Sequence, residues 1–421
     1  MDRPLSSCLV DLKSLARDAL DLTQEIIDCC GPRLTGSDAC RRAATMLGER
    51  LHPLCDHVAV EPFDVRPGAF LGFMRVTGTC YLAGTAFALA SMALPAALFF
   101  SAGAFVTIVQ FLLYRELLDP LFPRRVGYNV VGILEPAGEA IRQLIFAGHH
   151  DSAYVFNLLC SLPRLYRLRL VGAFVAVFSM LVVAWLSVAL ARREMRPAVV
   201  VFDCAMGVLF LAPMWFFHGD EGTPGAGDNL IASSMLVSIA RALFGGEAPL
   251  RGTRIILFSS DAEESGLRGA RAFVRRHESE LRRLPTTLFN ADSIYRSDCI
   301  QFLCSDLNGL VRLDRTLAER CVEIARKLGI PSRTFGMYPG AGATDAAEFA
   351  RIGVNSTTLL ALPTDIESAN LVYHTPDDVV ANIEPAAVEA CLAIALGLAR
   401  EMDGDAPGNP LAARGRCAAD L

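Results

Sequence analysis

Polar side chains able to bind a metal occur in five short motifs, and most of these motifs follow an apolar stretch typical of a β-strand. In the first motif, FAGHHDSAY, His149 and Asp151 are separated by one residue and therefore lie on the same side of an extended chain. A carboxylate commonly orients an imidazole that binds a metal. The alternative is a pair of histidines whose hydrogen bonds are satisfied at the end of a strand, so this motif alone does not decide.

The second and third motifs supply acidic residues. In PGAGDNLIASS, Gly225 and Gly227 permit a sharp turn before Asp228, which opens a helix and by itself could be an ordinary N-cap. In RIILFSSDAEESGLRG, a strand ends in a loop that holds Glu263 and Glu264. A solvated acidic loop is one interpretation of this pair. Burial of both carboxylates would instead require a cation, which one acid could bind while the other faces the water on the metal.

The last two motifs complete a set of ligands. TLFNADSIY places Asp292 at the end of a strand, and YHTPDDVVANI places His374 in a loop. Zinc accepts mixed nitrogen and oxygen ligands, and one carboxylate can bridge two zinc ions about 3.5–4 Å apart. With Glu263 left over as a base, the remaining side chains suit two zinc ions per chain; they are His149, Asp228, Glu264, Asp292 and His374.

These motifs are spaced along alternating strand-like and helix-like stretches. Short apolar, β-branched stretches occur at 129–134, 144–147, 254–259, 287–290 and 357–362, and helical periods occur at 229–243, 269–276 and 315–328. Such alternation predicts an α/β fold with a mostly parallel central sheet flanked by helices. Sheets of this kind bind ligands outside the carboxyl ends of their strands, where the polar motifs lie.

Two long apolar segments interrupt this pattern. Residues 76–114 contain no charged side chain, and a span needs about 20 apolar residues, so this run fits two membrane helices with a turn near 91–96. A second pair is expected from 170–191 and 197–217, where Asp203 is the one charge and the fourth span is the weakest. Buried helical hairpins in a soluble core are the alternative. Because so long a run without charge is rare in soluble proteins, we expect two inserted transmembrane helical hairpins in a lipid bilayer.

The hairpins divide the chain. We expect them at 68–127 and 158–219, inserted into a catalytic domain built from 1–67, 128–157 and 220–402, with a flexible tail at 403–421. The N-terminal segment has the pattern of a soluble helix and no secretory signal. Seven arginines flank the spans on the catalytic side and three on the other, which places the catalytic domain in the cytoplasm and the hairpins in the cell inner membrane.

Composition excludes several classes of protein. The 421 residues are 52% hydrophobic and carry a formal net charge of −6, which argues against a disordered chain and against a nucleic-acid partner. Thirteen cysteines follow no zinc-finger or disulfide-framework spacing, as expected of free thiols in a reducing compartment. The sequence carries no signal for an oligomeric state.

The five motifs, in this order, resemble those of the co-catalytic zinc exopeptidases of the bacterial leucyl aminopeptidase and glutamate carboxypeptidase type. That family has H-x-D, then Gly-Ala-x-Asp-Asn, then Glu-Glu-x-Gly-Leu-x-Gly-Ser, then a strand-end Asp and a late His. The chain has HHD at 149–151, GAGDN at 225–229, EESGLRGA at 263–270, Asp292 and His374. The stretch from Thr344 to Leu359 also resembles the family's approach to its last core strand. Gly227 and Ala270 depart from the pattern, but neither is an expected ligand.

The resemblance implies a role for each residue. His149 and Asp292 would bind one zinc ion, Glu264 and His374 the other, and Asp228 would bridge them. Asp151 would orient His149, and Glu263 would be the general base for attack of a metal-bound hydroxide on a peptide carbonyl.

The implied protein is a membrane-anchored zinc exopeptidase, in particular an aminopeptidase that acts on peptides. A carboxypeptidase, a dipeptidase and an aminoacyl cyclase remain alternatives of the same fold. An inactive membrane interaction module and a transporter are less favoured, because every ligand position is filled and the spans hold a single charge.

Overall fold

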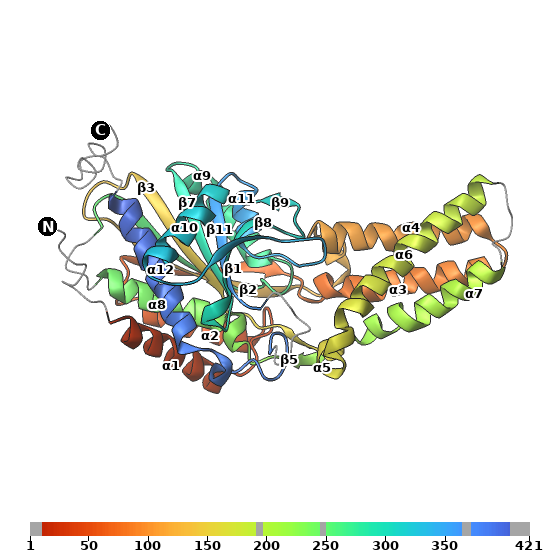
Figure 1. Ribbon diagram of the computed structural model, residues 1–421, viewed down its shortest axis with the longest axis horizontal. Helices are drawn as coiled ribbons and strands as arrows, with labels where there is room; N and C mark the ends of the chain where they lie inside the picture. Colours follow the sequence, from red (N-terminus) through yellow and green to blue (C-terminus); the bar gives the residue numbers. More distant parts are fainter. Residues whose placement is uncertain (1–10, 191–196, 245–249, 364–371, 405–421) are drawn as a thin grey trace.

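The computed structural model describes residues 11–190, 197–244, 250–363 and 372–404. Within these residues the chain forms an α/β domain and a bundle of long helices that projects from one end of it (Figure 1). A small two-stranded sheet, β4 (Tyr154–Phe156) with β5 (His218–Gly222), and the short helix α5 (Asn157–Ser161) lie where the second pair of long helices leaves the domain.

The domain is built on a nine-stranded sheet with the order β1-β2-β6-β3-β7-β11-β8-β10, and β9 pairs with β8. Strands β6, β3, β7 and β11 form a parallel centre, whereas β1, β2 and β8 pair antiparallel on either side. The expected mostly parallel sheet is therefore confirmed. In chain order the strands are β1 (His57–Val65), β2 (Arg125–Leu134), β3 (Arg142–His149), β6 (Thr253–Ser260), β7 (Thr286–Ile294), β8 (Ile300–Asp306), β9 (Val311–Arg312), β10 (Arg333–Gly336) and β11 (Asn355–Ala361).

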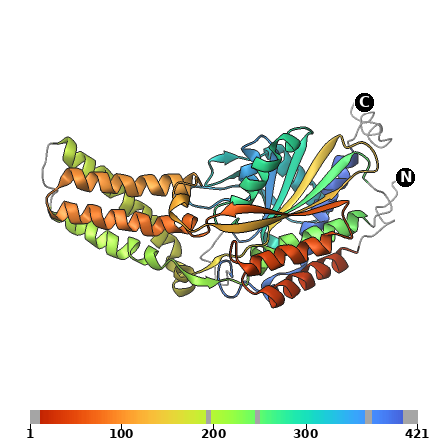
Figure 2. The same cartoon turned by 180° about the vertical axis from the view of Figure 1, so that it is seen from behind.

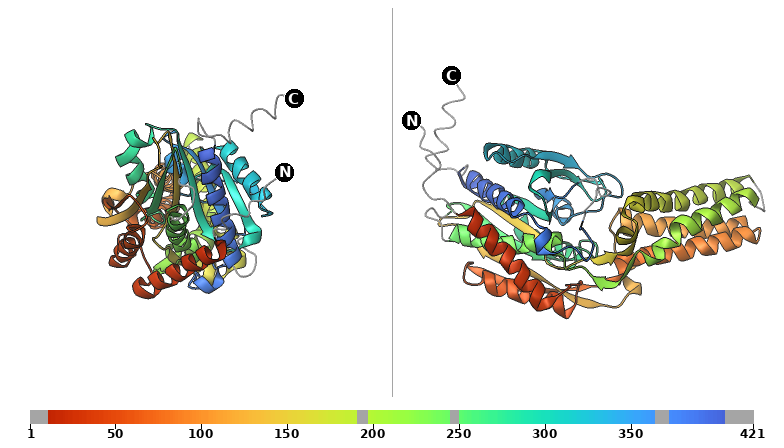
Figure 3. Two further views of the ribbon diagram at one scale, coloured as in Figure 1. Left: turned by 90° about the vertical axis from the view of Figure 1, so that its left-hand side faces the viewer. Right: turned by 60° about the horizontal axis from the view of Figure 1, so that its bottom comes forward.

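Helices cover both faces of the sheet because the central strands are apolar on both sides (Figure 3). In β3, Leu144 and Phe146 pack into the core beneath one helical layer, and Ile145 and Ala147 pack beneath the other, since successive side chains point to opposite faces. The first layer contains α1 (Leu12–Cys30), α2 (Asp38–Leu51), α8 (Ile231–Phe244), α10 (Arg315–Lys327) and α12 (Pro385–Gly404). The second contains α9 (Arg268–Leu281) and α11 (Ala346–Ala350).

The bundle consists of two helical hairpins that run side by side (Figures 1 and 2). The first pairs α3 (Gly68–Leu89) with α4 (Ala93–Val106), which continues as the π-helical η1 (Thr107–Leu112). The second pairs α6 (Tyr166–Ala189) with α7 (Pro197–Met206), which continues through η4 (Gly207–Leu211) and η5 (Pro213–Phe216). The chain turns between α3 and α4 at 90–92, at the start of the predicted range 91–96, and Pro95 lies in the first turn of α4.

Three helices of the described chain are long and apolar enough to cross a membrane: Ala93–Leu112, Pro163–Ala189 and Pro197–Phe216. The fourth apolar segment, which looked weakest in sequence, is thus among them. The helix that falls short is α3, which contains Arg75, four glycines and three threonines. Its 22 residues still measure about 33 Å at 1.5 Å per residue, comparable to the roughly 30 Å hydrocarbon core of a bilayer.

The bundle has a polar contact inside and an apolar surface outside. Asp203 of α7 is buried and accepts hydrogen bonds from Tyr81 and Thr85 of α3. Large apolar side chains on the outer faces are exposed, including Leu82, Phe105, Val182, Val208 and Leu209. So many exposed large apolar side chains on one bundle are unusual on a protein surrounded by water.

Ion pairs made by two buried arginines of α9 tie the first hairpin to the domain. After η1 the chain passes through η2 (Asp119–Leu121), and Asp119 lies 2.8 Å from Arg268 of α9. One turn later in α9, Arg271 lies 2.9 Å from Glu116 and 2.8 Å from Glu348 of α11. These contacts fix the domain end of α3 and η1 next to the loop that precedes α9, which carries two of the predicted site residues.

Candidate metal centre

The predicted site residues come together at the carboxyl ends of the parallel strands. His149 ends β3, and Asp292 lies two residues before the end of β7. Asp228 lies in the short helix η6 (Ala226–Leu230), directly before α8. Glu263 and Glu264 lie in the loop between β6 and α9. The other two predicted residues, in loops, are Asp151 and His374.

Five of these side chains form two groups that share Asp228. One group is His149, Asp228 and Asp292, and the other is Asp228, Glu264 and His374; in each, possible ligand atoms lie within 4.8 Å of one another. Asp228 Oδ1 is 3.4 Å from His149 Nε2, and Asp228 Oδ2 is 2.8 Å from His374 Nε2. Each oxygen of Asp228 therefore faces a different group, as a bridging carboxylate requires.

Glu263 lies beside both groups. Its Oε2 is 3.9 Å from His149 Nε2, and His149, Glu263 and Glu264 form a third set with ligand atoms within 4.8 Å. By distance alone Glu263 could be a ligand. Because the two groups around Asp228 each hold three ligands without it, Glu263 is free for another role.

Asp151 orients both a histidine and the acidic loop. His149 Nδ1 donates to the carbonyl oxygen of Asp151 at 3.2 Å and lies 3.3 Å from Asp151 Oδ1. Since a carbonyl only accepts, Nδ1 carries the proton and Nε2 keeps its lone pair toward the two groups. The Asp151 carboxylate also accepts from the backbone N–H groups of Glu263 and Glu264, each at 3.2 Å. This second contact was not anticipated from sequence.

The donor set fits divalent cations. Asp228 Oδ2 and Glu264 Oε1 lie 2.8 and 3.3 Å from His374 Nε2, yet neither buried oxygen has a donor in hydrogen-bonding geometry within the described chain. Lone pairs that converge in this way, from two imidazoles and several carboxylates, match the coordination preferences of zinc.

The pKa values of the buried carboxyl groups also indicate a site for cations. Burial raises the pKa of Asp292 to about 8, and the neighbouring Asp228 carboxylate adds to the rise. Burial also raises the pKa of Glu263 well above its usual range. For Asp228, burial opposes ionisation, but the close imidazoles of His149 and His374 hold its pKa below the ordinary value. Two divalent cations would supply the positive charge that such a group of buried carboxylates needs.

Three residues of the site have left-handed backbones. Ala262, Ser293 and His374 have φ values of 66°, 50° and 55°, which are uncommon for residues other than glycine. Each is a predicted ligand or lies next to a predicted site residue. Strained backbone of this kind is often kept where it positions functional groups.

The loop that carries Asp228 is held by groups that sequence reasoning did not single out. The Asp378 carboxylate accepts from the backbone N–H of Gly227 at 2.7 Å and of Asp228 at 3.3 Å. The Asn229 side chain donates to the carbonyl of Ala291 on β7 at 2.8 Å. Asp378 stands in the TPDD stretch after His374, but nothing local in that stretch distinguishes it from the exposed Asp377.

A buried arginine joins two ligand loops. Arg33 is fully buried, and its guanidinium donates at 2.8 Å to each of three carbonyls, those of His150, Pro224 and Gly225. The first carbonyl adjoins His149, and the other two precede η6. In the sequence, Arg33 is marked only by its position in a turn that contains proline and glycine after the first helix. That position does not show that its side chain is buried.

Replacing Arg33 by methionine should destabilise the domain by about 3 kcal/mol or more, since three buried carbonyls lose a charged donor. Arg33→Lys should recover only part of this loss, because an ammonium lacks the planar fork that reaches separated acceptors. Thermal unfolding in detergent measures the effect, and Arg41→Met on the exposed face of α2 is the control. Equal stability of the Arg33→Met and Arg41→Met variants would contradict the assignment.

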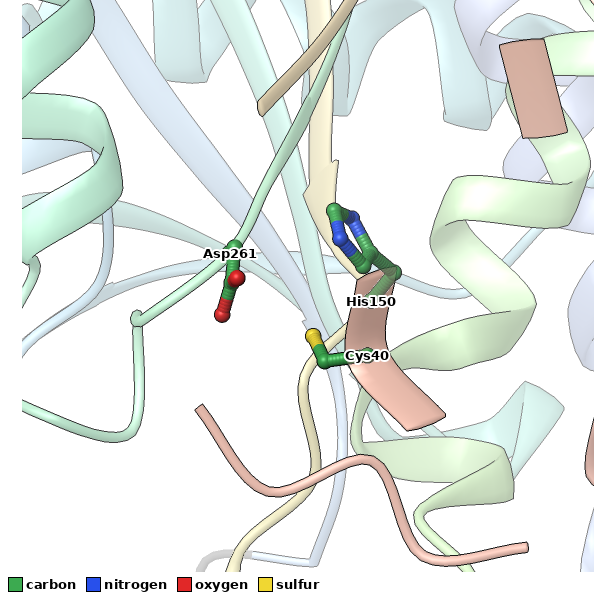
Figure 4. A group of neighbouring side chains, drawn as sticks. All are labelled: Cys40, His150 and Asp261. Carbon is green, nitrogen blue, oxygen red and sulfur yellow. The ribbon is translucent and has the colours of Figure 1, made fainter. Parts of the chain in front are cut away.

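A separate cluster lies behind the ligands. Cys40 of α2, His150 and Asp261 point toward one another from three segments (Figure 4), and each offers a possible ligand atom within 4.8 Å of the others. The Cys40 thiol hydrogen-bonds to the Asp261 carboxylate, which also accepts from the Tyr128 N–H at 3.0 Å. His150, whose pKa burial lowers to about 3, pairs with Ser259 at 2.8 Å. We place the metal centre at the groups that share Asp228, because Glu264, Asp292 and His374 of those groups line a substrate-sized cavity.

A cavity of about 610 Å³ lies over the groups around Asp228. Its polar end is lined by Glu263, Glu264, Asp292, Ser293 and His374, so a molecule in the cavity would contact the carboxylates of both groups. Volumes of 300–1,000 Å³ are typical of sites for small molecules and cofactors.

Comparisons with known proteins agree with this geometry. The sequence matches the model of peptidase family M28 over residues 129–399. No curated protein matches it.

Several solved structures share the fold. BSAP, a zinc aminopeptidase from Bacillus subtilis, is 16% identical with a TM-score of 0.53, and the match covers 92% of this chain and 95% of that one. LapA aminopeptidase from Legionella pneumophila is 13% identical with a TM-score of 0.53, covering 93% and 73%. Glutaminyl cyclase from an Acidobacteriales bacterium is 13% identical with a TM-score of 0.54, covering 96% and 100%. At such identities the likeness concerns the fold.

Proposed function

Because the chain belongs to peptidase family M28, we propose that it is a membrane-anchored zinc exopeptidase, and specifically an aminopeptidase. The observation that carries the proposal is the pair of ligand groups that share Asp228, with Glu263 beside them at a substrate-sized cavity. His149 and Asp292 would hold one zinc ion, Glu264 and His374 a second, and Asp228 both. When bound, zinc would polarise the peptide carbonyl and lower the pKa of water toward 7.

The remaining residues would position groups and move protons. Glu263 would accept a proton from the attacking water and deliver it to the nitrogen of the departing amine, as a general base and then a general acid. Asp151 would keep His149 in the tautomer that directs Nε2 toward the ligand group. Through the backbone of Glu263 and Glu264 it would also fix the base relative to the ligands.

The charges around the cavity favour an aminopeptidase over a carboxypeptidase. A substrate carboxylate would require a basic group close to the ligands. Among the described lining residues the acids Glu263, Glu264 and Asp292 outnumber the one arginine, Arg167, which lies at the domain end of α6. This end suits a substrate with a free α-amine.

A panel of substrates tests the proposal. Purified protein loaded with zinc should hydrolyse aminoacyl-p-nitroanilides, lose that activity on chelation and regain it when zinc is restored. N-acetylated aminoacyl-p-nitroanilides, which lack the free amine, should not be hydrolysed. The panel also contains a glutaminyl peptide, and its cyclisation in place of hydrolysis would identify a cyclase. Activity unaffected by removal of all divalent metal would refute the zinc mechanism.

We also propose that the helical bundle lies in the cell inner membrane with the catalytic domain in the cytoplasm. Support comes from the three helices of sufficient length and apolarity and from the exposed apolar side chains of the bundle. Both hairpins leave and return at the domain. Arg75, Arg164 and Arg167 lie at that end, as the positive-inside tendency requires of a cytoplasmic side.

Labelling with a membrane-impermeant thiol reagent measures this orientation. Ser91→Cys, at the exposed turn between α3 and α4, should be labelled in intact cells. Glu139→Cys, in an exposed loop between β2 and β3, should be labelled only after the cells are opened. Both variants are made in a background without reactive native cysteines. The reverse labelling pattern would place the catalytic domain outside, and recovery of the protein in the soluble fraction would refute membrane anchoring.

A further inference from the structure

The cavity over the metal centre does not end at the α/β domain. It continues between the helices of the bundle, so that one space is lined at one end by acids and His374 and at the other by the helices α3, η1 and α6. Further lining residues come from loops of the domain. The bundle end is lined by Phe70, Phe73, Phe111, Leu170, Phe174 and Val177.

The bundle end is chemically suited to an apolar group. Two of its hydroxyl-bearing residues, Thr77 and Thr107, already satisfy each other, with their oxygens 3.0 Å apart, and Thr107 also donates to the carbonyl of Gly103 at 3.0 Å. These two hydroxyl groups are therefore not left in need of a ligand. Aromatic and aliphatic walls of this kind bind apolar chains through the hydrophobic effect.

The two ends together define an amphiphilic ligand. The polar end suits an amide with a free α-amine, and the volume of about 610 Å³ exceeds what one amino-acid side chain fills. The outer surface of the same helices is apolar, so a molecule dissolved in the bilayer meets the bundle directly.

We propose that the bundle end of the cavity binds a long aliphatic chain, and that the substrates are amides joining an amino acid with a free α-amine to such a chain. The inference rests on the proposed aminopeptidase function and names its substrate class. Hydrolysis forms a bond between the water oxygen and the carbonyl carbon and breaks the C–N bond. The released nitrogen takes a proton, which leaves a free amino acid and an alkylamine.

The structure offers a matched pair of variants on one helix. Val177 lines the cavity and is 5% exposed, whereas Val175, two residues earlier in α6, is 49% exposed on the outer face. Val177→Phe places a phenyl ring in the bundle end, and Val175→Phe makes the same chemical change outside it. Any effect of the detergent or of substrate partitioning is common to both variants.

The experiment measures kcat/KM for leucyl alkylamides with chains of two to twelve carbons, below their micelle concentrations, with the zinc-loaded full chain in nanodiscs. For the wild type we expect a rise of about two- to fourfold per methylene until the cavity is filled, since a buried methylene contributes about 0.8 kcal/mol, or fourfold. The ratio of kcat/KM for the decyl to the ethyl amide should fall about tenfold in Val177→Phe and stay unchanged in Val175→Phe.

Each other outcome has a defined meaning. Absence of hydrolysis of every amide and of aminoacyl-p-nitroanilides would defeat the proposed function itself. Hydrolysis of the ethyl amide without any dependence on chain length, or an equal loss in both valine variants, would overturn the chain-binding site alone. N-acyl leucines of increasing chain length are measured in parallel. If only this series showed a dependence on chain length, the proposal that the substrate carries a free α-amine would be wrong. Should Val177→Phe not fold, Phe174→Ala must shift the preferred chain to greater length.

Discussion

Replacing Glu263 by glutamine should lower kcat by about 10²–10⁴-fold while the protein keeps its zinc. Glutamine preserves the shape of the side chain but cannot take a proton from water, and losses of this size are typical when a general base is removed. Glu263 is suited to this role by its place in the lining of the cavity and by Asp151, which binds its backbone N–H at 3.2 Å. Single-turnover rates and the zinc content of the same sample measure the two effects.

The neighbouring residue provides the control. Glu264→Gln exchanges one oxygen of a group that already contains Asp228 and His374, so it should weaken zinc binding, and excess zinc should restore part of the activity. Excess zinc should not restore the Glu263→Gln variant. If zinc rescued Glu263→Gln and failed to rescue Glu264→Gln, the roles within the pair would have to be exchanged.

The central part of the fold was predictable because its strands are buried on both faces. Strands β3, β6 and β7 appear in the sequence as short, β-branched, apolar stretches, and every residue of β7 is buried. The edge strand β1 was not predicted. It contains Glu61 and Pro62 and is largely exposed, so its sequence lacks the uninterrupted apolar pattern of a central strand.

The candidate ligands of the site were more predictable than the residues that hold the ligand loops in place. His149, Asp228 and Asp292 lie at strand ends or at the start of a helix. The local sequence already indicates that ligands bind at such positions of an α/β sheet. Arg33 and Asp378 act through contacts with backbone groups more than a hundred residues away, at 2.7–2.8 Å. Such contacts exist only once the chain has folded, and no spacing rule anticipates them.

The path from the metal centre into the bundle was also beyond sequence analysis. Hydropathy identifies apolar helices but does not say which face of each helix borders the active site. Packing between the helices sets that face. At Gly172 of α6, for example, an added Cβ would lie 2.2 Å from the ring of Phe210, so the close approach of this face of α6 to Phe210 requires glycine.

Asp228 is the residue on which both ligand groups depend, and its loss should be the most severe single change at the site. Its Oδ1 lies 3.4 Å from His149 Nε2, and its Oδ2 lies 2.8 Å from His374 Nε2. Asp292 belongs to only one of the two groups around Asp228. In the proposed two-zinc centre, removal of Asp228 would therefore take a ligand from both ions at once, whereas removal of Asp292 would take a ligand from one.

Asp228→Ala should accordingly release both zinc ions and lower hydrolysis by at least about 10³-fold, the upper range for loss of one charge-stabilising group. Asp292→Ala should keep about one zinc ion per chain. Zinc content after dialysis separates the two results, and thermal unfolding gives an independent measure, because a ligand that binds only the folded state raises its stability in proportion to RT ln(1 + [L]/Kd). Added zinc should raise the unfolding temperature of the wild type and of Asp292→Ala but not of Asp228→Ala. Retention of two zinc ions by Asp228→Ala would show that the carboxylate faces both groups without bridging them, since each ion would then be held by the remaining ligands alone.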